Sequence, residues 1–346
     1  MSKTDSQGTS QLSIAQGQQT GLSLIELMIS MTIGAFVTIG VLNLFNANSD
    51  TYNVLQAQAR LQESANFGLN VMSRDLEKSG YRGCFSSGDV YFTMATEDDI
   101  PADYDIRYGL SVFNGVGEDD WTTSATTLPA AVSSVATAET DVLALRYLDN
   151  DEAYLASALT QGSEDVVVTV ASGASSSIAT NDLALLHDCE KATLFKVTEA
   201  TSSSSTTVTF AHAIESGGNA VSGLAQTGVF GTNAAVSSIV GRHYYIAPGA
   251  SSRTGLADLS LYRRDAAGAS ELVEGIEDLQ VLVGIDSDGD GVPNQYYAPA
   301  ANLDMSQAVT ILLEITANSV VPVGSSESDG LLRRTYRRTV QIRNAG

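Results

Sequence analysis

Apolar residues are continuous in one segment near the N-terminus and periodic over the rest of the chain. Residues 1–21 are polar, whereas residues 22–46 are almost entirely apolar. No residue from Leu27 to Phe45 is charged, and at ~1.5 Å per residue this stretch spans roughly 28 Å, close to the hydrocarbon thickness of a bilayer. The pattern predicts a membrane-spanning helix, with a buried core helix as the alternative. A secretory signal peptide fits poorly, because no charged segment directly precedes the stretch and no small-residue cleavage site follows it.

The helical pattern continues past the apolar segment. Residues 47–79 contain no proline and are rich in helix formers. One apolar face recurs in them at helical spacing, made by Ala65, Leu69, Met72 and Leu76. We therefore expect one helix from Leu22 to Ser79 that Gly80 and Gly83 end, with its second half packed under a globular head. An independent surface helix over residues 47–79 is the alternative.

Residues 80–346 have the short apolar runs and polar spacers of a β-rich head. Apolar and polar side chains largely alternate through residues 309–316, which is the period of a strand. Strands are predicted at 139–148, 164–171, 182–188, 193–199, 206–212, 240–247, 259–264, 279–285, 307–317 and 332–343. Clusters of Gly, Ser and Thr at 172–180 and 201–207 are typical of loops. Residues 86–130 are acidic and carry no assignable pattern, so the head is either one unit or a core sheet with a large insertion.

The composition narrows the class of protein. The 346 residues include 18 Lys and Arg against 40 Asp and Glu, a net charge of −22, which disfavours a nucleic-acid-binding domain. Hydrophobic residues make up 43%, enough for a folded core. Two cysteines and three histidines exclude a cysteine-rich zinc protein and a histidine-rich metal centre. The chain has no G-x-S-x-G, P-loop, H-E-x-x-H or C-x-x-C motif, so we do not expect an enzyme.

Glu26 is the one ionisable residue in the apolar segment. A carboxylate at this depth in a membrane needs a partner, or it lies near enough to the interface to reach water. It closes the sequence GLSLIE at residues 21–26, which resembles the type III signal of type IV prepilins: a Gly, an apolar residue, Ser or Thr, Leu, an aliphatic residue and Glu. The leader, the Gly, the Glu and the long apolar run occur together here.

The resemblance implies a processing step and a role for the carboxylate. A membrane-bound prepilin peptidase would cut between Gly21 and Leu22 and methylate the new N-terminus, leaving the apolar segment in the mature protein. Glu26 would then pair with the free amine of a neighbouring subunit's first residue in the filament core, a charge-assisted bond in a low-dielectric setting. The leader has fewer basic residues than is usual in the family, so the orientation in the membrane rests on the resemblance.

Three head segments resemble PilW-type minor pilins in the same order. They are GYRGC at 80–84, LVEGIEDLQVLVGIDSDGDGVPNQY at 272–296 and RRTYRRTVQIRN at 333–344. The resemblance implies an α+β, type IV pilin-like fold, in which a long N-terminal helix packs on an antiparallel β-rich head. The expected domains are a cleaved leader at 1–21, a helix at 22–79 (transmembrane or filament core at 22–46, amphipathic at 47–79) and a periplasmic or extracellular head at 80–346.

The family implies a structural subunit that helps to initiate or stabilise type IV pili, which serve twitching motility and adhesion. In a Gram-negative bacterium it would be made in the inner membrane, in contact with lipid and with its head in the periplasm, and then built into the surface pilus. Its partners would be other minor and major pilins, the prepilin peptidase and the inner-membrane assembly machinery. Two alternatives remain: a minor pseudopilin of type II secretion, and a calcium-dependent adhesin or ligand-binding module displayed on the pilus.

Cys84 and Cys189 are the only cysteines. An exported head meets an oxidising compartment, so we expect a disulfide between the end of the helix and a strand of the head. Closing a loop of roughly 100 residues would constrain the unfolded chain by nominally ~4–5 kcal/mol. Two unpaired buried thiols are the alternative, and no His or Asn context marks a catalytic cysteine.

Residues 286–291 (DSDGDG) are typical of a calcium-binding loop. Alternating carboxylates with a Gly at the sixth position let a tight loop turn several oxygens inward, which suits Ca²⁺. The expected ligands are Asp286, Asp288, Asp290, the Val292 carbonyl and Asn294. The twelfth position is Tyr297 rather than the Glu of an EF-hand, so we expect a looser DxDxDG loop. An acidic hairpin turn that binds no metal is the alternative.

The C-terminal segment concentrates five basic residues, Arg333, Arg334, Arg337, Arg338 and Arg343. In a strand, Arg334 and Arg338 share a face with the apolar side chains, and the other three point the opposite way. We expect these arginines to neutralise the acidic head. A docking patch for anionic partners or DNA is the alternative.

Overall fold

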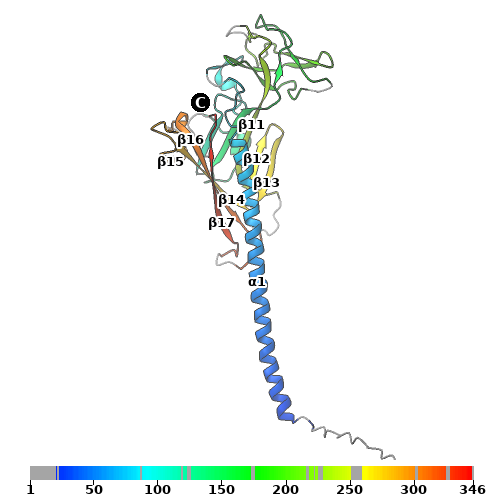
Figure 1. Cartoon of the computed structure of the whole chain (residues 1–346), viewed down its shortest axis with the longest axis vertical. Helices are drawn as coiled ribbons and strands as arrows, with labels where there is room; N and C mark the ends of the chain where they lie inside the picture. The colour runs from blue at the N-terminus through cyan, green and yellow to red at the C-terminus, as the bar shows by residue number, and fades with distance from the viewer. Residues whose placement is uncertain are drawn as a thin grey trace, which may run out of the picture. The chain divides into compact units, whose positions relative to one another are not determined.

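The computed structural model describes residues 21, 23–85, 88–117, 120–122, 126–172, 176–215, 218–221, 223–224, 229–250, 259–300, 303–324 and 328–344. Within this part of the chain, one long N-terminal helix precedes a β-rich, mainly antiparallel head, which confirms the expected α+β, pilin-like class (Figure 1). The chain divides into two compact units, Met1–Asn53 and Val54–Gly346. Each unit is described by itself.

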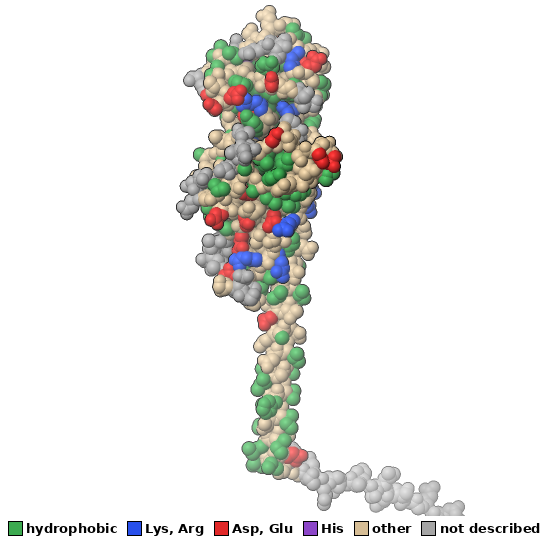
Figure 2. All heavy atoms as spheres, turned by 90° about the vertical axis from the view of Figure 1, so that its left-hand side faces the viewer, with side chains coloured by type: hydrophobic (Ala, Val, Ile, Leu, Met, Phe, Trp, Pro, Cys, Tyr) green, Lys and Arg blue, Asp and Glu red, His purple; other side chains and the backbone are tan. Residues whose placement is uncertain are grey.

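The first unit contains the beginning of helix α1 (Leu24–Leu76), which continues into the second unit. Residues 23–53 are all exposed, and their hydrophobic side chains appear as green spheres along the helix in Figure 2. Leu24, Phe36 and Phe45 are 77%, 72% and 69% exposed. Water is a poor solvent for such a surface, so this part of α1 needs an apolar environment supplied from outside the chain.

The second unit contains the rest of α1 and the other described elements. In chain order these are β1 (Val90–Phe92), η1 (Glu97–Asp99), β2 (Leu110–Gly117), β3 (Asp120–Thr122), α2 (Ala130–Ser133), β4 (Val142–Leu148), β5 (Ala153–Tyr154), β6 (Val166–Thr169), β7 (Leu183–His187), β8 (Ala192–Lys196), β9 (Glu199–Ser202), β10 (Thr207–Ala211), β11 (Ala235–Pro248), β12 (Leu259–Asp265), β13 (Gly268–Glu274), β14 (Ile276–Ile285), β15 (Gln295–Tyr297), η2 (Met305–Gln307), β16 (Ala308–Asn318) and β17 (Arg333–Gln341).

The described strands form three sheets. The largest has the order β1-β8-β7-β11-β4-β2-β3, with β5 and β12 also paired to β11, and β13 paired to β12. A second sheet has the order β6-β10-β9, and a third has the order β15-β14-β16-β17. Strand β1 pairs parallel with β8. The other described ladders are antiparallel, as expected of this head.

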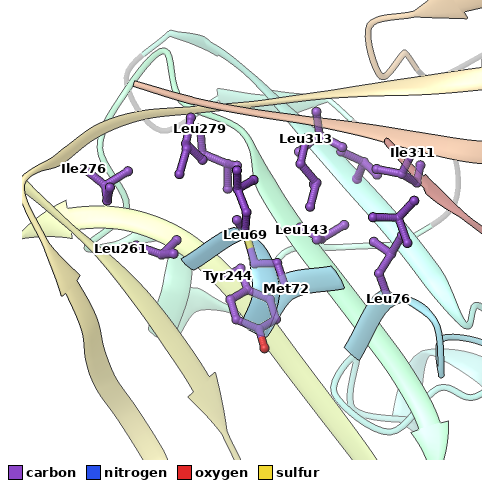
Figure 3. Close-up of a cluster of buried hydrophobic side chains, with 14 of the residues drawn as sticks. Leu69, Met72, Leu76, Leu143, Tyr244, Leu261, Ile276, Leu279, Ile311 and Leu313 are labelled. Carbon is purple, nitrogen blue, oxygen red and sulfur yellow. The ribbon is translucent and has the colours of Figure 1, made fainter. Parts of the chain in front are cut away.

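The main core forms where the second part of α1 packs against strands of two sheets. Leu69, Met72 and Leu76 lie among side chains from β4, β11, β14 and β16 (Figure 3). With Ala65 they form the apolar face that the sequence predicts, and they are 0–2% exposed. Each large apolar side chain buried in this way contributes about 1.5–3 kcal/mol. The head therefore holds this part of α1 through a continuous apolar contact.

A separate core fills the region of residues 153–236. Val166, Phe195 and Phe210 are fully buried there, where the β6-β10-β9 sheet packs against β7 and β8. Strand β11 belongs to both regions, because its first residues pair with β7 and its later residues pair with β4 and β12. The head is thus one compact unit with more than one core.

Every strand predicted from the sequence coincides with an observed strand, although the ends differ. The sequence pattern missed β1, β2 and β3, which lie in the unassigned residues 86–130, and also β5, β13 and β15. It also treated residues 201–207 as a loop, whereas β9 extends to Ser202 and pairs with β10. Strand β9 is polar and largely exposed, so backbone pairing rather than an apolar period defines it.

Helix α1 ends three residues earlier than predicted, at Leu76 rather than Ser79. The Ser79 N–H donates to the Leu76 carbonyl at 3.1 Å, which is the tighter spacing of a terminal turn. Gly80 follows with φ +74°, a conformation that favours glycine. The left-handed backbone conformation of Gly80 therefore explains why the helix does not continue past this residue.

Candidate functional site

The expected processing site lies at the start of α1. Gly21 is exposed, with no atom within 4 Å of the position that a Cβ would take, whereas Leu22 lies outside the described residues. The Leu27 N–H donates to the Ser23 carbonyl at 3.1 Å, which closes the first helical turn. Glu26 is exposed in this turn, where the positive end of the helix dipole favours a carboxylate.

The apolar part of α1 leaves its one charged side chain, Glu26, without a partner among the described residues. Ser30, Thr32 and Thr38 each donate to the carbonyl oxygen four residues earlier, at 2.7–2.8 Å, so their hydroxyls are satisfied inside the helix. The Glu26 side chain has no hydrogen bond or ion pair with any described residue. Helix α1 is the one described helix long and apolar enough to cross a membrane, with a window of mean hydropathy 2.0 and no buried residue in it.

A buried ion pair joins the other end of α1 to the sheet. Asp75 is 5% exposed and accepts hydrogen bonds from Arg242 and from the hydroxyls of Tyr244 and Tyr147. Burial and the nearby Asp75 charge raise the pKa of Tyr244 and of Tyr147 above the ordinary value, so both hydroxyls remain protonated donors. The sequence analysis missed this cluster. Its one signal is a carboxylate placed beside the apolar face that ends at Leu76.

Two glycines and a disulfide fix the segment that follows α1. Gly80 and Gly83 have φ +74° and +67°, and a Cβ on Gly83 would lie 2.7 Å from the His187 ring. Cys84 is bonded to Cys189, with the two Cα atoms 4.7 Å apart. This is the expected pairing. Because Cys189 lies between β7 and β8, the disulfide ties the end of the helix to that hairpin.

The acidic loop connects β14 to β15, which pair as an antiparallel hairpin. One carboxylate oxygen from each of Asp286, Asp288 and Asp290 lies within 4.8 Å of the others. The Asp286 oxygens accept the N–H groups of Gly291 and Gly289, each at 2.7 Å, and these bonds lower the pKa of Asp286. The carboxylate therefore stays charged well below neutral pH.

The remaining expected ligands have other contacts within the loop. The Asn294 side-chain oxygen accepts the N–H and the hydroxyl of Ser287 at 2.6 and 2.9 Å. The Val292 N–H donates to Asp290 at 2.8 Å. The three aspartates are consequently the converging groups that can hold a hard divalent cation, while Asn294 closes the loop.

The C-terminal arginines are mostly paired. Arg333 lies 2.7 Å from Glu277 and 2.6 Å from Asp329. Arg337 pairs with Glu314, and Arg343 lies 3.6 Å from Glu77. Arg338 donates to the Asn70 side chain of α1, and Arg334 is exposed. Two of the five thus pair with carboxylates of the head, as expected of arginines that neutralise it, and a third, Arg343, pairs with a carboxylate just after α1.

Comparison with known protein families gives two matches. Residues 17–42 match the prokaryotic N-terminal methylation motif, a range that includes Gly21 and Glu26. Residues 243–319 match the type IV pilus-assembly protein W family. This second range runs from β11 to the end of β16 and includes the acidic loop and strands that pack around α1. No curated protein and no solved structure gives a significant match to the chain.

Proposed function

The two family matches support a type IV pilus minor pilin of the PilW type, and we propose that this subunit helps to initiate or stabilise the assembly of type IV pili. Such pili serve twitching motility and adhesion. The subunit is inserted in the inner membrane with its head in the periplasm and then enters the surface pilus. Its partners are other minor and major pilins, the prepilin peptidase and the assembly machinery.

One observation carries this proposal: α1 exposes a continuous apolar surface in its first part and is held in a folded head by its second part. Leu24, Ile25 and Met28 are 77%, 66% and 59% exposed, and the apolar surface continues to Phe45. A contiguous apolar surface of this kind marks a membrane or protein contact. In the inner membrane lipid covers it, and in the filament the helices of other subunits cover it.

The processing step belongs to the same proposal. The peptidase cuts between Gly21 and Leu22 and methylates the new N-terminus, and the open surface around Gly21 supports access to the bond. Glu26 then pairs with the first amine of a neighbouring subunit. The support for this role is that Glu26 has no partner among the described residues and lies in an apolar surface, where an unpaired charge is costly once buried.

A deletion of the gene separates this function from that of a type II secretion pseudopilin. Surface pili and twitching are scored in parallel with secretion of an exported enzyme. The proposal expects fewer pili and reduced twitching, with secretion unchanged and with both pilus phenotypes restored by the intact gene. Normal piliation together with a secretion defect would contradict it.

We also propose that the acidic loop binds Ca²⁺ through Asp286, Asp288 and Asp290. The support is the convergence of their oxygens within 4.8 Å, because three carboxylates so close together repel one another unless a cation neutralises them. Gly289 and Gly291, with φ +78° and +84°, let the backbone curl around that point. Bound Ca²⁺ would stabilise the β14–β15 hairpin.

A further inference from the structure

A cavity of about 240 Å³ lies beside the turn that follows α1. Its wall includes Gly80 and Arg82 from that turn, Arg107 and Leu110 near the start of β2, and Ile342 after β17. All of these belong to the second compact unit. The cavity therefore does not involve the exposed first part of α1 or the acidic loop.

The charge of this cavity is opposite to that of the chain. Among the described residues, its charged lining side chains are Arg82 and Arg107, with no carboxylate side chain, although the chain has 40 acidic residues against 18 basic ones. Two other cavities in the described residues carry both signs: one is lined by Arg60 and Glu63, and one by Lys78, Arg343, Glu77 and Asp149. The arginine-lined cavity is thus electrostatically suited to an anion.

The two arginines are not equivalent. The Arg107 guanidinium lies 2.8 Å from Asp105 and 2.8 Å from Glu97, so it is already engaged by two carboxylates. The Arg82 side chain forms no hydrogen bond or ion pair with any described residue. It is partly buried, and burial lowers its pKa below the ordinary value because no carboxylate opposes the effect. Arg82 is therefore the free cation of the cavity.

The backbone on either side of Arg82 is held firmly. The Gly80 N–H donates to the Arg146 carbonyl at 2.9 Å, and Gly80 and Gly83 both take left-handed conformations. Cys84 is fixed by its disulfide to Cys189. The segment 80–84 therefore fixes the point from which the Arg82 side chain extends, so binding need not order this part of the backbone.

The remaining wall is part apolar and part polar. Its apolar side chains are Leu110, Met305, Ala308 and Ile342, and its polar ones are Ser79, Tyr108, Ser306 and Asn344. The ligand's stem would lie against the apolar part. Arginine pairs with a carboxylate through two parallel N–H···O bonds, and the unpartnered Arg82 guanidinium can form one such pair. We propose that this cavity binds a carboxylate carried on a short aliphatic stem, with Arg82 as the residue that holds it.

Two sources can supply that carboxylate: the aspartate or glutamate side chain of a neighbouring subunit, or a free aliphatic acid. The first source rests on the proposed function, whereas the second does not. The binding chemistry is the same for both. Binding is therefore tested on the isolated protein, and the source is tested in the assembled filament.

Propionate is the probe for the isolated protein. The mature full-length chain in detergent, labelled with ¹⁵N-arginine, is titrated with propionate while the Nε–H resonances are recorded. We expect the Arg82 resonance to shift and saturate in the millimolar range, and inorganic phosphate to shift it less because phosphate has no aliphatic part to contact Leu110 and Ile342. Arg82→Gln should lose the response to propionate. Arg82→Lys should retain a weaker propionate-dependent rise in melting temperature. Arg334→Gln, the control, should bind propionate as the unmodified chain does.

Thermal melting gives a second measurement of propionate binding, which does not depend on assigning the Arg82 resonance. Since Arg82 has no partner among the described residues, Arg82→Gln should fold and melt no lower than the unmodified chain without ligand. Propionate should raise the melting temperature of the unmodified chain and not that of Arg82→Gln. A response that persists in Arg82→Gln, or no saturable response in the unmodified chain, would overturn the proposal.

The filament assay then identifies the source. Arg82→Gln and the unmodified chain are co-expressed with distinct tags and recovered from sheared pili. Lower recovery of Arg82→Gln, with propionate binding lost in the isolated protein, supports a carboxylate from a neighbouring subunit. Equal recovery with the same loss of binding supports a free acid. A failure of the proposed pilus function would appear as recovery of neither form, and it leaves the titration result intact.

Discussion

The two parts of α1 are one continuous helix in opposite surroundings. From Ser23 to Asn53 every described residue is exposed, and the carboxylate in the first turn, Glu26, has no described partner. Further along, Leu69 and Met72 are at most 2% exposed, and Asp75 has three hydrogen-bonding residues around it. Helix propensity alone cannot produce this difference. It follows from what each part packs against: the head supplies partners for the second part, and the first part must find its partners outside the chain.

The largest expected effect is on cleavage of the chain, just before the first part of α1. Replacing Gly21 with valine should block cleavage completely, because the peptidase must fit the chain closely at that residue. Immunoblots and mass spectrometry should then find only the uncleaved chain. Gly34→Val, which enlarges another exposed glycine of the same helix, is the control and should be cleaved normally. Normal cleavage of Gly21→Val would show that the motif is not the processing signal.

The next largest effect is on the free energy of unfolding, and it is measured by removing one carboxylate from each part of α1. Asp75→Asn should lower the free energy of unfolding by about 3 kcal/mol, because it leaves the Arg242 charge without its buried partner. Asp50→Asn removes an exposed carboxylate from the first part and should change it by no more than about 0.5 kcal/mol. Thermal melts of the full chain in detergent measure both. Equal effects of the two substitutions would contradict the environments assigned to them.

A smaller effect concerns assembly rather than stability. Glu26→Val should leave cleavage and membrane insertion intact, since it makes the span more apolar. Its recovery in sheared pili should fall by about tenfold against co-expressed unmodified chain, which corresponds to about 1.4 kcal/mol. Glu63→Val, a carboxylate removed from the second part, should be recovered normally. If Glu26→Val and the unmodified chain were recovered equally, Glu26 would have no pairing role.

The smallest effect lies in the acidic loop, away from α1. With a dissociation constant of ~10⁻⁴–10⁻³ M, Ca²⁺ at ~1 mM should stabilise the chain by about 0.4–1.4 kcal/mol and raise its melting temperature modestly. Mg²⁺ should do less because it demands a strict octahedron. Asp288→Ala should abolish the calcium response, whereas Asp98→Ala, which removes an exposed carboxylate elsewhere, should keep it. An unchanged calcium response in Asp288→Ala would show that the loop is an acidic turn that binds no metal.

Much of the fold follows from local patterns. The strand around residues 309–316 is half buried, so its alternation records which face meets the core. Strand β1 has three residues and pairs with β8, about a hundred residues later in the chain. A strand this short has too few positions to carry a period, and only its tertiary partner defines it. This is why the residues of β1 had no assignable pattern.

The candidate functional residues also fall into two groups: those within one local motif and those that only folding brings together. Gly21 and Glu26 lie in one short motif, so the sequence identifies them together. Asp75 and Arg242 are 167 positions apart, and neither belongs to a local pattern that points to the other. The cavity around Arg82 is also assembled from distant segments. Contacts that close only on folding cannot be inferred from spacing along the chain.

The central claim is that the first part of α1 is processed and then covered by other subunits in a pilus. Mass spectrometry of the chain recovered from sheared pili tests it most directly. The account predicts a chain that begins at an N-methylated Leu22 and lacks residues 1–21. Recovery of a chain that still begins at Met1, or absence of the chain from purified pili that contain their other subunits, would contradict it.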